Sequence, residues 1–328
     1  MEHTIVIQPY KLFSVGFLKR YLITMRPYLL FVSGITGIVG MSIGPDIISI
    51  KIILVFLASF LSYGFGQALT DCFQIDTDTF SSPYRPLVQG LISKENVLIV
   101  SIIGLTFCVS IFGYYNHLNL LLGVLAGIGL YTYTYFKKKW WAGPFYNSWI
   151  VAVLFLMAFN IHKPLWSEIN FTTLIYVLIA VYFGYANFVL TGYFKDITAD
   201  SKTGYNTLPV LYGRKSAAIV SDLFALFTIA TSILAIVSSK IDFTNFMSWI
   251  IVLLFGFGSF LTIISQIRLH YVKTDEEAFA AISPVVHSYI LLLSSIAIAQ
   301  KVEWAIPLIL FYLCFVYVMK SRPMKNQV

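Results

Sequence analysis

The sequence has little charge for its length. Only 11% of its 328 residues are Asp, Glu, Lys or Arg, whereas a soluble domain carries about 25%. Apolar residues make up 58% of the chain and form long runs from end to end, with no hydrophilic domain, low-complexity linker or heptad array between them. This composition excludes an ordinary soluble domain and predicts a single integral membrane domain over residues 1–328.

Cysteine and processing signals are also scarce. Cys72, Cys108 and Cys314 lie in or beside apolar segments and lack the spacing of metal ligands, so they are predicted to be free thiols. The first 25 residues include Lys11 and Lys19 and lack a short apolar core followed by a cleavage site. We therefore expect residues 1–25 to form a cytoplasmic N-terminal segment rather than a removable signal.

The apolar runs predict an all-α, polytopic bundle of nine to ten transmembrane helices around a central cavity open to lipid. Each run is about long enough to cross a hydrocarbon core of roughly 30 Å. Pro284 interrupts the ninth run and Pro307 begins the tenth, so nine spans with a re-entrant end is the alternative. The predicted spans are residues 27–47, 52–72, 97–115, 118–136, 145–161, 171–193, 217–239, 246–267, 279–299 and 304–320.

The positive charges are unevenly distributed between the predicted loops. With ten spans and a cytoplasmic N-terminus, outside loops hold four of the 22 Lys and Arg residues, Lys51, Lys163, Lys240 and Lys301. Because Lys and Arg gather on the cytoplasmic side of membrane proteins, this asymmetry predicts that both termini are cytoplasmic. It also explains the net charge of +7 without nucleic acid as a partner.

Acidic residues gather in two short places. The first acidic segment, residues 70–87, reads TDCFQIDTDTFSSPYRPL, and the second acidic segment, residues 195–210, reads KDITADSKTGYNTLPV. Each follows an apolar helix, contains a base, and falls on the predicted cytoplasmic side. This shared design hints at an internal duplication of the two halves.

The spacing within these segments suits a divalent cation. Asp196 and Asp200 are four residues apart, so on a continuing helix they share a face, and Asp71 and Asp78 are two helical turns apart. A magnesium ion between carboxylates removes their repulsion and also binds substrate phosphates. Arg85 can grip phosphate oxygens with its planar fork, while Lys202 can act as a point charge.

Transport and a simple solvated surface are the alternatives to a phosphate site. Acids at helix ends are usually just solvated, but two such segments on one side of a membrane weaken that interpretation. A transporter would carry its acids near the bilayer centre rather than at helix ends.

At this point the two segments resemble the paired motifs of the UbiA-type superfamily of intramembrane prenyltransferases. The first motif of that family runs into Arg-Pro, here Arg85 and Pro86, and the second is Asp-x-x-x-Asp running into Thr-Leu-Pro. Arg26 and Pro27 resemble the Arg-Pro that opens the first helix of the family. The family has Asn and Asp where this chain has Thr70 and Gln74, and commonly Arg where it has Ser201.

The resemblance implies a magnesium-dependent enzyme that transfers an isoprenyl group from an isoprenyl diphosphate to an aromatic or lipid-type acceptor. It implies Mg²⁺ as cofactor, membrane lipid as surroundings and no obligate protein partner. Some relatives with altered first motifs resemble terpene cyclases, which makes a cyclase the runner-up and a transporter the third candidate. The implied catalytic and metal-binding residues are Asp71, Asp78, Asp196 and Asp200, with Asp76 as a further metal ligand.

Other residues are implied to bind the substrate. The implied diphosphate-binding residues are Arg85, Lys202, Lys139, Arg26, Tyr84 and Tyr193, although the run Lys137, Lys138 and Lys139 leaves the choice of lysine open. Asn147 and Asn187 are candidates for the wall of the substrate cavity, and an interhelical hydrogen bond is an equally good interpretation of each.

Overall fold

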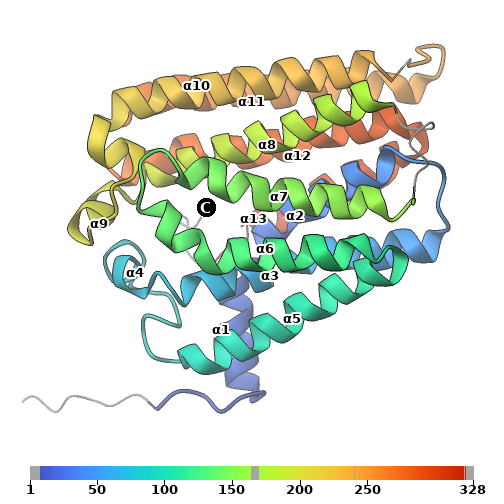
Figure 1. Ribbon diagram of the computed structural model, residues 1–328. Coiled ribbons are helices and arrows are strands. Elements are labelled where there is room, and N and C mark those ends of the chain that lie inside the picture. Colours follow the sequence, from blue (N-terminus) through green and yellow to red (C-terminus); the bar gives the residue numbers. More distant parts are fainter. Residues whose placement is uncertain (1–7, 164–169, 240, 321, 323–328) are drawn as a thin grey trace, which may run out of the picture.

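The computed structural model describes residues 8–163, 170–239, 241–320 and 322, and this part of the chain is a helical bundle with no strand. Most of the long helices lie side by side and run in roughly one direction across the molecule (Figure 1). Two short helices, α4 and α9, lie at the same end of this bundle. Each follows a long helix, which places both acidic segments at one end.

Eleven helices of at least eleven residues and two short ones make up this described part. In chain order the helices are α1 (Val15–Met25), α2 (Leu30–Ser42), α3 (Ser49–Asp71), α4 (Ile75–Ser81), α5 (Lys94–Tyr115), α6 (Leu118–Lys137), α7 (Gly143–Asn160), α8 (Phe171–Tyr193), α9 (Ile197–Lys202), α10 (Leu208–Val237), α11 (Trp249–Tyr271), α12 (Phe279–Gln300) and α13 (Ala305–Lys320).

The predicted membrane architecture is confirmed. Within the described residues, nine helical stretches are long and apolar enough to cross a membrane, and α1 with α2 makes a tenth if that bent pair counts as one span. The predicted span 171–193 coincides with α8, and most others differ from the observed helices by a few residues. The helix predicted at 217–239 begins earlier, at Leu208, and is kinked at Gly213, whose φ of 79° interrupts the helical backbone.

The first predicted span, residues 27–47, is not a straight helix. It is a short 3-10 turn followed by α2, which has only 13 residues, and α1 precedes it at an angle of 44°. The break lies at Arg26, which has a left-handed backbone (φ 53°). Pro27 is the physical cause, because a proline disfavours the right-handed helical conformation of the residue before it.

The two C-terminal helices, in contrast, are both complete, so the re-entrant alternative is wrong. Helix α12 continues through Pro284. A proline has no N–H to donate to the carbonyl four residues earlier, here that of Ala280. The side chain of Arg268 donates to that carbonyl instead, at 2.7 Å, so the freed group still has a partner.

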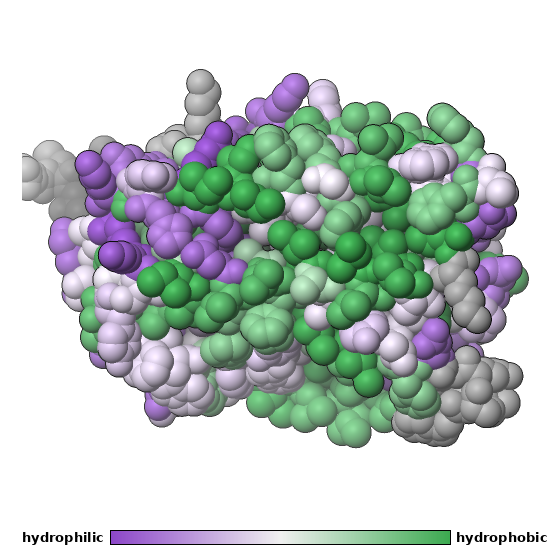
Figure 2. All heavy atoms as spheres, turned by 90° about the horizontal axis from the view of Figure 1, so that it is seen from above, coloured by the Kyte–Doolittle hydropathy of each residue, from purple (hydrophilic) through white to green (hydrophobic). Residues whose placement is uncertain are grey.

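The core and the lipid-facing surface are distributed unequally among the helices. Helix α12 is 89% buried over its apolar window, whereas the spans that contain α11 and α13 are each only 22% buried. Figure 2 shows broad apolar areas along the bundle and hydrophilic residues gathered toward the end that holds α9. Such exposed apolar area is expected of helices that face lipid.

Candidate active site

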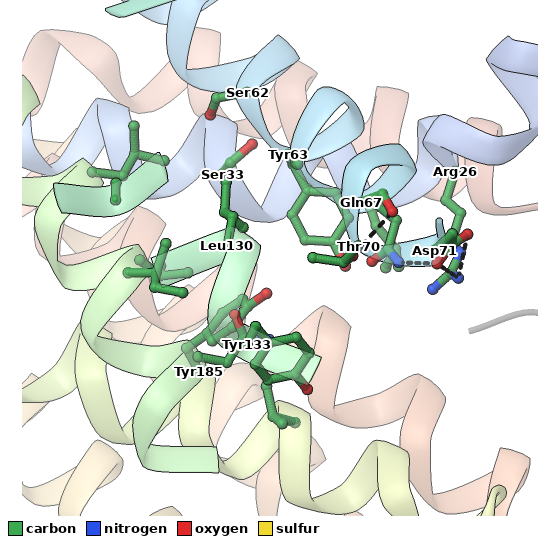
Figure 3. Close-up of a pocket in the computed structure, with 18 of the residues that line it drawn as sticks. Arg26, Ser33, Ser62, Tyr63, Gln67, Thr70, Asp71, Leu130, Tyr133 and Tyr185 are labelled. Atoms are coloured by element: carbon green, nitrogen blue, oxygen red, sulfur yellow. Dashed lines mark hydrogen bonds and ion pairs between the residues drawn. The ribbon is translucent and has the colours of Figure 1, made fainter. Parts of the chain in front are cut away.

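A central cavity of about 230 Å³ lies among α3, α5, α6, α7 and α8. Its two ends differ in chemistry. The deep part is apolar, with Leu105, Phe112, Leu130 and Met157 in its wall, while the end beside the acidic segments is polar. Figure 3 shows Tyr63, Gln67 and Thr70 on one side of it, with Tyr133 and Tyr185 on the other. The polar lining residues at that end are Arg26, Gln67, Asp71, Gln74, Asp78, Arg85, Lys137, Tyr193, Lys195 and Asp196.

Asp71, the last residue of α3, is held by three side chains. One guanidinium nitrogen of Arg26, Nη2, donates to both carboxylate oxygens, at 2.9 and 3.1 Å. Gln67 lies one helical turn earlier and donates from Nε2 to Oδ1 at 2.6 Å (Figure 3). Arg85 Nη1 lies 3.7 Å from the same oxygen. Burial at 4% side-chain exposure makes these charge-assisted contacts strong.

Asp78 lies on α4 and forms a buried ion pair with Arg85. Burial raises the pKa of the Asp78 carboxyl, and the positive charge of Arg85 opposes that effect. Arg85 thus lies between Asp71 and Asp78, and it brings together two carboxylates from opposite sides of the helix break at Cys72–Gln74.

Lys195 and Asp196 of the second acidic segment line the cavity themselves, and Asp200 is connected to it through Lys137. The ammonium of Lys137 lies 3.5 Å from Asp200 Oδ1 and donates to Gln74 Oε1 at 3.2 Å. Thr77 donates to the same Asp200 oxygen at 3.2 Å. Burial raises the pKa of Asp200 to about 6, and Lys137 opposes the shift. Lys137 and Thr77 therefore connect the two acidic segments across 123 residues of sequence.

Asp76, predicted as a further metal ligand, does not line the cavity. Its side chain is 49% exposed, accepts a hydrogen bond from Tyr205 at 3.1 Å, and lies 3.9 Å from Lys138. The reason is helical geometry, because residues two apart on α4 point in nearly opposite directions, so Asp76 faces away when Asp78 faces inward. We therefore leave Asp76 out of the proposed ligand set.

The structure separates the other predicted substrate-binding residues into two groups. Arg26, Arg85, Tyr193 and Asn147 line the central cavity. Lys139 does not line the cavity, because its ammonium lies over the ring of Tyr135. Of the three consecutive lysines, Lys137 is the one that lines the cavity. Lys202 and Tyr84 line a second, neighbouring pocket.

Asn187, predicted in the cavity wall, lies instead between helices. Its amide donates to the backbone carbonyl and hydroxyl of Ser221 on α10, at 2.8 and 2.9 Å. Its oxygen accepts from Gln266 on α11 at 3.3 Å. These hydrogen bonds join α8, α10 and α11. From the sequence, an interhelical hydrogen bond and a place in the cavity wall were equally good interpretations of Asn187, and the structure shows the first.

The donor atoms at the polar end fit a magnesium ion only together with a substrate. Among the described residues, no three His, Cys, Asp or Glu side chains gather closely enough to hold a metal by themselves. Asp200 Oδ2 is nevertheless buried without a hydrogen-bond partner, and carboxylates are hard oxygen ligands. Magnesium commonly takes one or two carboxylates and completes its shell with phosphate and water, so the residues present fit that arrangement.

Sequence reasoning missed three residues of this site. Gln67 and Gln74 were not singled out as ligands of anything, yet one holds Asp71 and the other holds Lys137. Lys195 begins the second acidic segment and lines the cavity beside Asp196. The one available signal was position, since Gln67 is four residues before Asp71 on a helix.

The chain is similar to known proteins over most of its length. The model of the UbiA prenyltransferase family matches residues 33–289. Digeranylgeranylglyceryl phosphate synthase of Thermococcus kodakarensis is 29% identical over 226 residues, which cover 66% of this chain and 78% of that protein. The synthase of Pyrococcus abyssi is 27% identical over 234 residues, with the same coverage of both chains.

Solved structures share the fold. A digeranylgeranylglyceryl phosphate synthase superposes with a TM-score of 0.62 at 22% identity, over 86% of this chain and 98% of that one. A UbiA homolog from Archaeoglobus fulgidus, bound to GPP and Mg²⁺, gives a TM-score of 0.59 at 17% identity, over 83% of this chain and 99% of that one. With a family match over most of its length and a bundle of the same architecture, this chain belongs to the UbiA prenyltransferase family.

Proposed function

We propose that this chain is a magnesium-dependent prenyltransferase that moves an isoprenyl group from an isoprenyl diphosphate to a lipid-type acceptor inside the membrane. One observation carries the proposal: two acidic segments and their cations meet at the polar end of an otherwise apolar cavity. A prenyl diphosphate has the same two-part character, with a highly charged head and a hydrocarbon tail.

The head would lie among the cations of the polar end. Arg85, Lys137 and Lys195 all line the cavity there. In the structure Arg85 pairs with Asp78, and Lys137 pairs with Asp200. When a diphosphate binds, we expect these cations to exchange some of their hydrogen bonds with carboxylates for hydrogen bonds to phosphate oxygens. The carboxylate oxygens released in this way can then hold the metal.

The tail would extend into the apolar depth, where its burial stabilises binding by about 25 cal/mol for each Å² of apolar surface removed from water. The same surroundings exclude water from the reacting carbon. The hydroxyl groups of Tyr133 and Tyr193 hydrogen-bond to each other at 3.0 Å beside Lys137, and aromatic rings in this position can stabilise a nearby cation.

In the reaction, the bond between the allylic carbon and the diphosphate oxygen breaks, and its electron pair stays on the diphosphate. The acceptor oxygen then bonds to that carbon and releases its proton to an oxygen of the departing diphosphate. Arg85 and Lys137 stabilise the negative charge that develops on the diphosphate. Magnesium held by Asp71, Asp78, Asp196 or Asp200 would supply Lewis-acid stabilisation of that leaving group.

The test is transfer by the purified, detergent-solubilised protein, followed as diphosphate release and as product in organic extracts. We expect release to require both Mg²⁺ and an added lipid acceptor. Asp78→Asn should lower the rate about 100-fold, a typical effect of removing one electrostatic contact at a reacting group. Asp76→Asn is the matched control two residues away, and it should stay within about twofold of the wild type.

Two other outcomes would overturn the proposal. Release of diphosphate without an acceptor, together with a cyclised hydrocarbon or alcohol, would assign the chain as a cyclase. A folded wild-type protein that releases no diphosphate with any prenyl chain length or acceptor would direct attention to transport. Thermal unfolding of each variant, measured in parallel, separates lost chemistry from lost folding.

A further inference from the structure

Helix α6 presents one face to the central cavity. The residues of α6 that line the cavity recur every three or four positions, apart from one adjacent pair, so they form a single stripe along the helix. This α6 stripe consists of Gly123, Ala126, Gly127, Leu130, Tyr133 and Lys137. Figure 3 shows Leu130 and Tyr133 at the cavity. From Gly123 to Lys137 the stripe spans about 21 Å of helix, so the size of its side chains shapes much of the cavity wall.

The glycines of α6 differ in what surrounds them. A Cβ added to Gly123 would lie 2.4 Å from a methyl carbon of Val109 on α5. One added to Gly129 would lie 2.7 Å from the ring of Trp149 on α7. Both distances are far shorter than a carbon–carbon contact, so these two glycines let neighbouring helices approach closely. Around a Cβ added to Gly127, in contrast, no atom of the described residues outside its own stretch of α6 lies within 4 Å. Helix packing therefore does not require glycine at this position.

The backbone does not require glycine at position 127 either. Gly127 lies in the middle of α6, and glycine is one of the least favourable residues in a helix interior, whereas alanine is the most favourable. The glycines with a positive φ in the described part of the chain are Gly90, Gly204 and Gly213. Gly127 thus weakens its helix without serving a turn or a close contact. What its missing side chain does provide is open space in the cavity wall.

The apolar end of the cavity is bordered by large side chains. Phe112 of α5 and Met157 of α7 line it there and are 1% and 3% exposed. Asn119, near the start of α6, donates from Nδ2 to the backbone carbonyls of Phe112 and Met157, at 3.2 and 3.0 Å. Lys137 is at the other end of the same helix. A prenyl tail that begins beside Lys137 therefore runs along the α6 stripe toward Phe112 and Met157.

Gly127 lies at the level of the tail rather than of the diphosphate. It is ten residues before Lys137, which corresponds to about 15 Å along the helix. An isoprene unit adds four carbon–carbon bonds of about 1.5 Å each, or roughly 5 Å when extended. An extended tail therefore passes Gly127 after about three units. Any further unit has to occupy the space between Gly127 and the end of the cavity.

We propose that Gly127 determines which prenyl chain lengths this protein accepts, because its missing side chain leaves the passage through which the distal isoprene units reach Phe112 and Met157. This inference rests on the proposed prenyl transfer and concerns the donor, not the acceptor. A larger residue in place of Gly127 projects into the passage and excludes the units beyond it. The units between Gly127 and Lys137 keep their space. Gly127 is thus a specificity-determining residue that takes no part in breaking the bond to diphosphate.

The experiment measures binding of three prenyl thiolodiphosphates, analogues in which sulfur replaces the bridging oxygen and slows the reaction. The detergent-solubilised protein is titrated with the geranyl, farnesyl and geranylgeranyl analogues in the presence of Mg²⁺, without an acceptor. In Gly127→Leu the ratio of the Kd for the geranylgeranyl analogue to the Kd for the geranyl analogue should rise about tenfold over the wild type, the lower end of what a steric mismatch in a hydrophobic pocket costs. Gly127→Ala should shift the same ratio in the same direction, by less. Because each ratio is taken within one variant, a smaller fraction of folded protein does not change it.

Gly256→Leu is the matched control. Gly256 lies in α11 and is exposed, and a Cβ added to it would also have open space around it among the described residues. It does not line the cavity. The same substitution at this position should leave each of the three Kd values within twofold of the wild type.

Two results would overturn the inference while leaving prenyl transfer intact. One is a Kd ratio that stays at the wild-type value in both Gly127→Leu and Gly127→Ala. The other is an equal weakening for all three chain lengths, which would show that this position acts on the diphosphate end rather than on the distal units. A wild-type protein that binds none of the three analogues would instead contradict the proposed function itself.

Discussion

Three consecutive lysines have three different environments in this protein. The ammonium of Lys137 is buried beside Asp200 and Gln74, Lys138 lies over the ring of Tyr205 and near Asp76, and Lys139 lies over Tyr135 on the outside. Successive residues near the end of a helix point about 100° apart, so only one of the three can face the cavity. The sequence shows the three lysines, but the rotation of α6 against its neighbouring helices determines which of them faces the cavity.

This difference gives a prediction for paired variants. Lys137→Ala should reduce kcat/KM for the prenyl diphosphate about 100-fold or more, because it removes a cation from the reacting end and leaves Asp200 buried without its partner. Lys139→Ala should change the same quantity less than twofold. The measurement is radiolabelled transfer at saturating acceptor. Equal losses in the two variants would show that the register of α6 in the structure does not describe the working enzyme.

At the scale of elements, the chain builds both halves of its site in the same way. A long helix ends, three residues follow without helix, and a short helix carries the next carboxylate inward: α3 leads to α4, and α8 to α9. The spacing of the carboxylates along the sequence did not predict how Asp71 and Asp78 come together. Asp71 and Asp78 were predicted to share one helical face, but they meet through the break between α3 and α4, with Arg85 between them.

The opposite end of the bundle has its own anchor between elements. His162 follows α7 and donates from Nε2 to the carbonyl of Met41 at 2.9 Å, near the end of α2, where helix carbonyls lack partners within the helix. Its Nδ1 is buried without a partner. Burial lowers the pKa of His162 from 6.5 to about 4, so the folded protein holds this imidazole neutral.

The pH dependence of stability follows from that lowered pKa. Between about pH 6.5 and 4 the unfolded chain binds a proton at His162 that the folded chain does not, so the free energy of unfolding falls as the pH drops through this window. Above about pH 7 both states are neutral and His162 contributes no slope. We expect the Tm of the His162→Gln variant to fall less than the Tm of the wild type when the pH is lowered from 7.5 to 5.0. An equal decrease in Tm for both proteins, measured in detergent, would contradict this account.

At the scale of the whole molecule, the orientation in the membrane remains a prediction from charge. The excess of Lys and Arg lies at the end that holds both acidic segments, and such an excess marks the cytoplasmic side. The site would then take its diphosphate from the cytoplasm and its acceptor from the adjoining leaflet.

Cysteine labelling can test this orientation. Ser201→Cys lies in α9, next to the site, and Asp242→Cys lies beyond α10 at the opposite end. A membrane-impermeant maleimide should label the first only in inside-out vesicles and the second only in right-side-out vesicles. Cys72 and Cys108 are buried and Cys314 is exposed on a predicted span, so a variant without these three cysteines gives the background. The reverse pattern would invert the topology.

The sequence by itself determined the membrane class, the positions of nearly all spans and the two acidic segments, because each of these depends on residues close together in the chain. Apolar run length and carboxylate spacing are local properties. The tertiary structure decided which lysine faces the cavity, why Asp76 does not, and that Asn187 joins helices. Each of these depends on how a helix is rotated relative to helices that are distant in the sequence. Contacts such as the hydrogen bond from Thr77 to Asp200, between residues 123 apart, fix that rotation only when the bundle packs.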